Sequence, residues 1–188
     1  MRMNIVVVAE GMRTVWELEC LRKLGVCCKV STRVLDWKFA DAIVLPAELK
    51  RSDVSGKALP FQILMDECQI PVLAIDNGMR ILVDEEAGLG ILPGKIRPLA
   101  QKHVGWGEVV PKKPGFLEGV DRFPAFFGHS HYSEPKDRKC VAAVTKCGET
   151  TFPSALAMGN IFAVQFRLDK SGIIGQQVLE RFLQAVRR

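Results

Sequence analysis

Short apolar runs and helically spaced apolar residues alternate through the first half of the chain. Four runs predict buried strands: NIVVVA (residues 4–9), VCCKVS (26–31), DAIVLP (41–46) and PVLAI (71–75). Between them, Val15, Leu18 and Leu21 are spaced like one face of a helix, which predicts a helix over residues 14–24 that ends at Gly25. The segment FQILMDECQ (61–69) predicts another helix. This order predicts a parallel sheet covered by helices on both faces.

Glycine and proline divide the second half of the chain into shorter apolar segments. We expect these segments to join the same sheet as hairpins and edge strands: GWGEVV (105–110), PAFFGHSHY (124–132), CVAAVTKCG (140–148) and the long stretch 150–168. Residues 172–188 predict a closing amphipathic helix with cations in its last turn. The expected fold is α/β, a three-layer sandwich with a mostly parallel central sheet, in one domain over residues 1–188.

Composition and charge narrow the possible environments and partners. The chain has 188 residues, 48% of them hydrophobic, and lacks an apolar run of the ~18 residues that cross a bilayer. Its first residues predict a buried strand rather than a leader peptide, so a cytoplasmic protein without membrane contact is expected. The net charge is +5. Because the basic residues are dispersed and not interleaved with aromatic residues, a solvated basic surface is favoured over a nucleic-acid partner.

The cysteine and histidine residues give little indication of a metal site. Six cysteines are scattered without C-x-x-C spacing, which favours reduced thiols over disulfides or zinc ligands. His129 and His131 are two residues apart and would share one face of a strand, so they are the only candidate ligand pair. Simple polar packing is the favoured interpretation, and we expect neither a metal nor a cofactor.

Several separated stretches resemble, in the same order, the class I glutamine amidotransferases. The most specific are GLGILPGK (88–95), HVGWG (103–107) and GNIFAVQF followed by KSG (159–166 and 170–172). Together with the elbow PVLAIDNGMR (71–80), they resemble the glutaminase subunit of imidazole glycerol phosphate synthase over nearly the whole chain. The resemblance implies a flavodoxin-like amidotransferase fold. It also implies glutamine hydrolysis by a Cys-His-Glu triad and transfer of ammonia to a cyclase barrel.

This chain departs from the family pattern at each catalytic position. The family elbow has the sequence Gly-Ile-Cys-Leu-Gly-Met-Gln, and here Asp76 takes the place of the cysteine and Arg80 that of the final glutamine. Asn77 and Gly78 complete the elbow. The family base segment is His-Pro-Glu-Lys-Ser, and here Arg167 replaces the histidine and Asp169 the glutamate. In the strand that forms the oxyanion hole, Ala47 replaces a glycine.

These replacements predict a site that does not hydrolyse glutamine. A guanidinium stays charged at physiological pH, so Arg167 cannot relay protons as an imidazole does. We expect Asp76 and Arg167 to form an ion pair, with Asp169 as a second carboxylate for Arg167. We also expect Asp76 to cap the following helix and to tolerate the strained elbow backbone. The alternative, an aspartyl nucleophile at Asp76, would need a general base beside it.

The resemblance also suggests what such a chain could still do. His103 and Trp106 match the family's Gly-Trp segment, and Lys170 matches the position after its base motif; both segments form partner-facing surface in that family. The expected function is therefore a noncatalytic subunit that binds the cyclase barrel. Two alternatives stay open: an active glutamine amidotransferase that supplies ammonia, and a repurposed protein that binds a small anion between Arg80 and Arg167, although Arg80 is more simply expected to fill its pocket.

Overall fold

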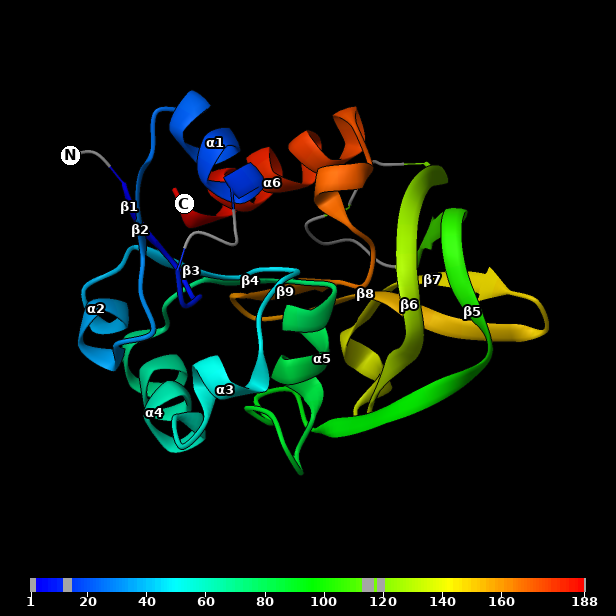
Figure 1. Ribbon diagram of the computed structural model, residues 1–188, viewed down its shortest axis with the longest axis horizontal. Helices are drawn as coiled ribbons and strands as arrows, with labels where there is room; N and C mark the ends of the chain where they lie inside the picture. Colours follow the sequence, from blue (N-terminus) through cyan, green and yellow to red (C-terminus); the bar gives the residue numbers. More distant parts are fainter. Residues whose placement is uncertain (1–2, 12–14, 113–116, 118–120, 188) are drawn as a thin grey trace.

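The computed structural model describes residues 3–11, 15–112, 117 and 121–187, and within them nine strands form one sheet (Figure 1). The strand order is β2-β1-β3-β4-β9-β8-β7-β5-β6. One half of the sheet is parallel and consists of β2 (Cys27–Val30), β1 (Asn4–Val7), β3 (Ala42–Leu45), β4 (Val72–Ile75) and β9 (Ile161–Val164). The other half continues from β9 through β8 (Thr150–Met158), β7 (Val141–Cys147), β5 (Gly94–Pro111) and β6 (Phe123–Pro135).

The sheet is mixed rather than mostly parallel, which corrects the overall prediction, while the second half joins the sheet as hairpins, as expected. Every pairing beyond β9 is antiparallel. The connections explain the difference, because β7 and β8 are joined through residues 148–149 and β8 and β9 through residues 159–160. A parallel pair needs a crossover of a dozen or more residues, whereas such short turns permit only hairpins.

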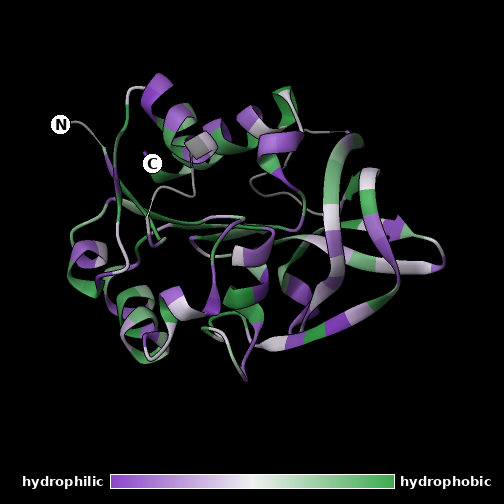
Figure 2. Ribbon diagram, viewed as in Figure 1, coloured by the Kyte–Doolittle hydropathy of each residue, from purple (hydrophilic) through white to green (hydrophobic). Residues whose placement is uncertain are grey.

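Helices cover both faces of the sheet, as a three-layer sandwich requires (Figure 1). One face packs against α1 (Val15–Lys23) and α6 (Ile173–Val186), and the other against α2 (Val34–Lys38), α3 (Arg51–Val54), α4 (Ala58–Cys68) and α5 (Asn77–Val83). Successive strand residues alternate between the two cores: Ile5 and Val7 belong to the first, Val6 and Val8 to the second. Figure 2 shows that these helices carry both hydrophobic and hydrophilic residues. Among the described residues, no helix is both long and apolar enough to cross a membrane.

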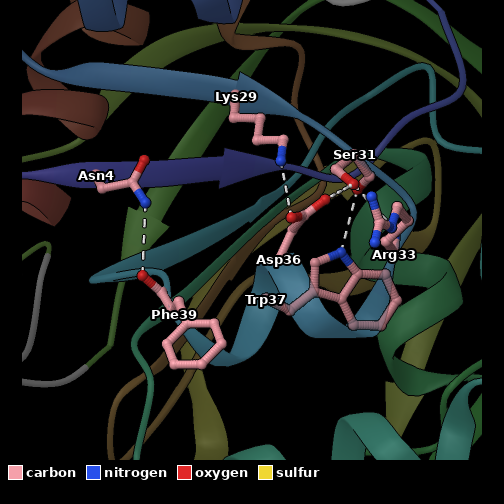
Figure 3. Close-up of polar contacts among 7 residues, drawn as sticks. All are labelled: Asn4, Lys29, Ser31, Arg33, Asp36, Trp37 and Phe39. Carbon is pink, nitrogen blue, oxygen red and sulfur yellow. Dashed lines mark hydrogen bonds and ion pairs between the residues drawn. The ribbon is translucent and has the colours of Figure 1, made fainter.

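The short helix α2 lies beside the edge strand β2 and is held by side chains from that strand and the residue after it (Figure 3). The indole Nε1 of the fully buried Trp37 donates a hydrogen bond to the carbonyl of Ser31 at 3.1 Å. Asp36 accepts hydrogen bonds from Lys29 and from the Ser31 hydroxyl, and these two partners lower the pKa of its carboxyl. A helix of one and a half turns depends on such contacts, because propensity alone does not stabilise it.

The hairpin of β5 and β6 extends from the antiparallel end of the sheet (Figure 1). Its pairing shifts between Pro98 and His103, and Val110 and Pro111 at the end of β5 pair with β7. The 3-10 turn η1 (Arg138–Cys140) leads from β6 to β7, and the 3-10 turn η2 (Leu168–Lys170) connects β9 to α6. The backbone N–H of Arg167 donates a hydrogen bond to the carbonyl of Phe126 at 2.8 Å. Residues near the start of β6 therefore lie beside η2.

Candidate functional site

The elbow between β4 and α5 is a single residue, Asp76, with φ 47° and ψ −103°. Two backbone hydrogen bonds hold it: its N–H donates to the carbonyl of Val164 at 2.7 Å, and its own carbonyl accepts from Arg80 N–H at 3.2 Å. Aspartate tolerates the left-handed helical region, in which ψ is near +45°. The ψ of Asp76 is −103°, so this residue lies outside that region. The backbone of Asp76 adopts a conformation that only glycine adopts without strain, as is common at functional turns.

The carboxylate of Asp76 is buried and does not cap α5. Only 5% of the residue is exposed, and its Oδ1 accepts a hydrogen bond of 3.1 Å from Nε2 of Gln165, which follows β9. Within the described part of the chain, the Asp76 side chain makes no capping hydrogen bond to α5, so the capping prediction is wrong; the carboxylate is bonded to Gln165 instead. Burial raises the pKa of Asp76 to about 6, although the cations of Arg80 and Arg167 and the Gln165 hydrogen bond act in the opposite direction.

Asn77 and Gly78 attach the first turn of α5 to β3 and the loop that follows it. The side-chain amide of Asn77 donates a hydrogen bond to the carbonyl of Leu49. A Cβ atom on Gly78 would lie 2.2 Å from the carbonyl oxygen of Leu45, a distance that no side chain can occupy. The close approach of helix and strand that the elbow sequence suggested is therefore present, and it requires glycine.

Arg167 lies at the position that the resemblance assigns to the family histidine, and two carboxylates hold its guanidinium. Asp169 binds it through two parallel hydrogen bonds of 2.8 Å, to Nε and Nη2, and Glu48 binds Nη2 at 2.7 Å. The predicted ion pair with Asp76 is wrong, since no nitrogen of Arg167 lies within 4.0 Å of that carboxylate. Asp169 is only two residues away on η2 and presents both oxygens to the planar fork, while Asp76 is bonded to Gln165.

A further acidic residue, Glu17 on α1, lies in the same region. It is 5% exposed, and burial raises the pKa of its carboxyl. The backbone N–H groups of Glu17 itself and of Ala47 lower that pKa, and the negative charge of Asp169 raises it. Ala47, the residue expected in the oxyanion strand, is itself buried. The arginine at the former base position is thus surrounded by acidic residues from three different segments of the chain.

No imidazole contacts Asp76 in the part of the chain that the structure describes. His129 is 4% exposed, its Nδ1 donates to the carbonyl of His131 at 2.8 Å, and burial lowers its pKa to about 4. His103 stacks on Phe127 with ring centroids 4.4 Å apart. His129 and His131 also differ in environment, because the first is buried and the second exposed. Among the described residues, no group of three or more His, Cys, Asp or Glu side chains is arranged to hold a metal ion.

Two of the three residues expected to face a partner meet on the surface beside η2. Trp106 is 60% exposed and lies edge-on to Phe126 at 6.0 Å, and the ammonium of Lys170 lies 5.4 Å above the same ring. Val104 is 70% exposed and shares the outward side of β5 with Trp106. We call Val104, Trp106, Phe126 and Lys170 the hairpin face. His103 is only 9% exposed, so its ring lies beneath this face and not on it.

Arg80 lines a cavity and does not fill it. The cavity has a volume of about 330 Å³, and Asn77, Arg51, Asp84 and His131 also line it. The Nε atom of Arg80 is completely enclosed and has no hydrogen-bond partner among the described residues. Open volume remains beside this side chain, and the expectation that Arg80 fills the family's substrate pocket stays a prediction.

Comparison with known proteins connects this geometry to one family. No family model matches the chain. The chain is 32% identical to the imidazole glycerol phosphate synthase subunit HisH of Microcystis aeruginosa, over 89% of this chain and 88% of that protein. It belongs to the HisH family. The HisH of Bacillus cereus strain B4264 is 31% identical over 95% of this chain and 93% of its own. The match to the Synechococcus HisH, at 35% identity, spans only 65% of this chain and 63% of that protein.

Solved structures confirm the amidotransferase fold of this HisH-family chain. A glutamine amidotransferase from Thermotoga maritima superposes with a TM-score of 0.70 at 14% identity, covering 100% of this chain and 83% of its own. Another structure described as a glutamine amidotransferase gives a TM-score of 0.75 at 17% identity, with 98% and 99% coverage. The expectation of a class I glutamine amidotransferase fold is thus confirmed, with the mixed sheet described above.

Sequence reasoning missed three polar residues of the site in this HisH-family chain: Glu17, Glu48 and Gln165. Glu48 and Gln165 follow β3 and β9 at the carboxyl ends of parallel strands. Ligands and functional side chains gather at that edge of an α/β sheet, so a search of all strand ends would have found both. Glu17 gave no such signal, because an acidic residue in the first turn of a helix is ordinarily a favourable solvated charge.

Proposed function

We propose that this HisH-family chain is a noncatalytic subunit that binds a cyclase barrel without hydrolysing glutamine. The observation that carries the proposal is the engagement of Arg167 by Asp169 and Glu48 at the position of the family base. Acyl transfer of this kind needs a nucleophile and a base that accepts and returns its proton. A guanidinium bonded to two carboxylates stays protonated, and its pKa is raised further by these partners, Asp169 first.

The nucleophile position supports the same conclusion. Asp76 carries no thiol, and its nearest polar partner is the neutral amide of Gln165. An aspartyl ester formed there would need a general base to activate water, and the described imidazoles make their contacts elsewhere. Loss of triad members costs ~10⁴ to 10⁶ in rate. We therefore expect no measurable glutaminase activity.

The hairpin face supports the proposed association with a cyclase. Tryptophan is enriched in protein interfaces, and a lysine at the rim contributes to electrostatic steering. Trp106 and Val104 are exposed together beside Lys170, so the face offers an apolar centre with a cation at its edge. Buried residues, among them Phe127 and His103, pack in this part of the hairpin.

Ammonia release from glutamine, measured with the purified cyclase subunit present, tests the catalytic part of the proposal. The unmodified chain should release none above background. The matched variant Asp76→Cys/Arg167→His/Asp169→Glu restores the family residues and should show turnover if the remaining scaffold is competent. Ammonia release by the unmodified chain would overturn the proposal and favour an active amidotransferase.

Size-exclusion chromatography of a mixture with the cyclase subunit tests the partner separately. The proposal expects a complex that elutes ahead of both components, and a Trp106→Ala variant should associate more weakly. Elution of the two proteins as independent species at micromolar concentration would remove the partner from the proposal while leaving the catalytic conclusion in place.

A further inference from the structure

The cavity beside the elbow contains a cation, Arg80, that makes no direct ion pair among the described residues; its charge interaction with a carboxylate is the longer-range one with Asp76. The side chains of Arg51, Asn77, Arg80, Asp84, Ile96 and His131 line its volume of about 330 Å³. They come from α3, α5, the residue after α5, β5 and β6. In Figure 1, α3 and α5 lie on the same side of the central strands. Among the residues the structure describes, the guanidinium of Arg80 makes no hydrogen bond and no ion pair, and its Nε is enclosed.

Asp84, the one carboxylate among the described residues that line this cavity, is already occupied. Asp84 Oδ2 binds Arg51 at 2.6 Å, and Asp84 Oδ1 accepts the backbone N–H groups of Glu86 and Ala87 at 3.1 and 3.3 Å. Arg51 is therefore neutralised and Asp84 has little remaining capacity. Asp76, on the other side of Arg80, is buried and bonded to Gln165 rather than to Arg80. Arg80 therefore lines open volume, and its enclosed Nε has no acceptor among the described residues.

A second cavity extends the first and adds another free cation. It has a volume of about 490 Å³ and shares Arg51, Asp84, Ile96 and His131 with the first. Lys95 lines it and forms no ion pair within the described ranges, whereas Arg97 beside it is paired with Glu134 at 2.7 Å. Two carboxylates also line this second cavity: Glu85, which is paired with Lys136 at 2.8 Å, and Glu86. The two volumes together exceed that of a single small ion, so the remainder of a ligand could extend from Arg80 toward Lys95.

We propose that this cavity binds the oxyanion group, phosphate or carboxylate, of a small molecule, and that Arg80 is its principal contact. A planar guanidinium donates two parallel hydrogen bonds to an oxyanion, and the match is strongest where water is largely excluded. Arg167 does not share in this binding, since Asp169 and Glu48 already occupy it. The site is independent of the cyclase: an anion could bind whether or not the hairpin face has a partner.

Isothermal titration calorimetry with inorganic phosphate, and in parallel with succinate, tests this site. Ionic strength is kept constant, because a basic protein also attracts anions without a specific site. The unmodified chain should show saturable binding of at least one of the two anions. The anion that binds identifies the ligand group as phosphate or carboxylate. No saturable binding of either would overturn the proposal.

Variants at Arg80 separate specific binding from general charge attraction. Arg80→Gln places the family's residue at this position and should weaken binding by about tenfold or more, which is the loss expected for charge-assisted hydrogen bonds. Arg80→Lys keeps the charge but not the fork, so its affinity should be intermediate. Arg33→Gln removes the same charge from an exposed position at α2, beside the opposite edge strand, and should leave the affinity unchanged. Equal anion affinities of Arg80→Gln and the unmodified chain would overturn the proposal. Thermal denaturation of each variant checks that it is folded.

Discussion

The buried carboxylate at the elbow should make this protein less stable at neutral pH than in mild acid. Asp76→Asn isolates this effect because it removes only the charge. The asparagine Oδ1 can still accept the Gln165 hydrogen bond, and asparagine, with the same shape, should keep the φ of 47° that Asp76 has. Backbone strain and packing therefore cancel when the variant is compared with the unmodified chain at one pH.

The size and direction of the effect follow from the pKa of Asp76. An ordinary aspartate has a pKa of 3.8, and burial raises that of Asp76 to about 6. This difference corresponds to roughly 3 kcal/mol, because one pKa unit is 1.36 kcal/mol. The folded state holds its proton more tightly than the unfolded state, so stability is complete below about pH 4 and declines as pH rises toward 6. Above that range, Asp76→Asn should be more stable by about 3 kcal/mol, and near pH 4 by almost nothing.

Urea denaturation at several pH values, followed by tryptophan fluorescence, measures this difference directly. Glu17 also has a raised pKa, but it titrates in both proteins and cancels in the comparison. Asp169→Asn is the matched control: the same chemical change removes a partner of Arg167 and should destabilise the protein at neutral pH. A stability difference for Asp76→Asn that is independent of pH, or a loss of stability at pH 7.5, would refute the reasoning.

Three further substitutions test the scaffold and the hairpin face. Gly78→Ala should cost about 3 kcal/mol or more in urea denaturation, since its Cβ would lie 2.2 Å from a β3 carbonyl oxygen, whereas Gly128→Ala has open space and should cost little. Arg167→Met should cost about 2 kcal/mol because it leaves the partly buried carboxylate of Asp169 and the exposed one of Glu48 unpaired, while Arg122→Met removes an exposed pair and should cost less than about 1 kcal/mol. Trp106→Ala should weaken cyclase binding about tenfold without changing the unfolding midpoint, because its side chain is mostly exposed.

The elements that sequence patterns predicted well are those whose signal is local. The strand at 72–75, the turn at Asp76 and the glycine at 78 follow from a short apolar run and the residues next to it, and the structure has them within a residue. The closing helix over Ile173–Val186 was predicted for the same reason, since its apolar face repeats over four turns.

The elements that were missed have weak local signals or depend on distant residues. β5 runs over 18 residues, but its polar segment KIRPLAQKH lies in a hairpin whose side chains are mostly exposed, so no apolar run identifies it. The partner of Arg167 could not be chosen from sequence either. Glu48 lies more than a hundred residues away, and its contact depends on how the loop after β3 lies beside η2.

The two arginines of the site differ in availability, and this difference links the elbow to the cavity. Arg167 is held by Glu48 and Asp169. Arg80 is the charged group that lowers the pKa of Asp76 most. An anion bound to Arg80 would oppose that influence, and the carboxyl of Asp76 would hold its proton to higher pH. Binding free energies are reciprocal, so deprotonation of Asp76 must weaken anion binding by the same factor.

Phosphate or succinate affinity should therefore fall as pH rises through about 6, and Asp76→Asn should remove most of this dependence in calorimetry. His129, whose pKa burial lowers to about 4, would not mimic it. His131, which lines the cavity, is present in both proteins, so the comparison with Asp76→Asn isolates the contribution of Asp76. An identical pH dependence in the Asp76→Asn variant would show that the elbow and the cavity are not coupled.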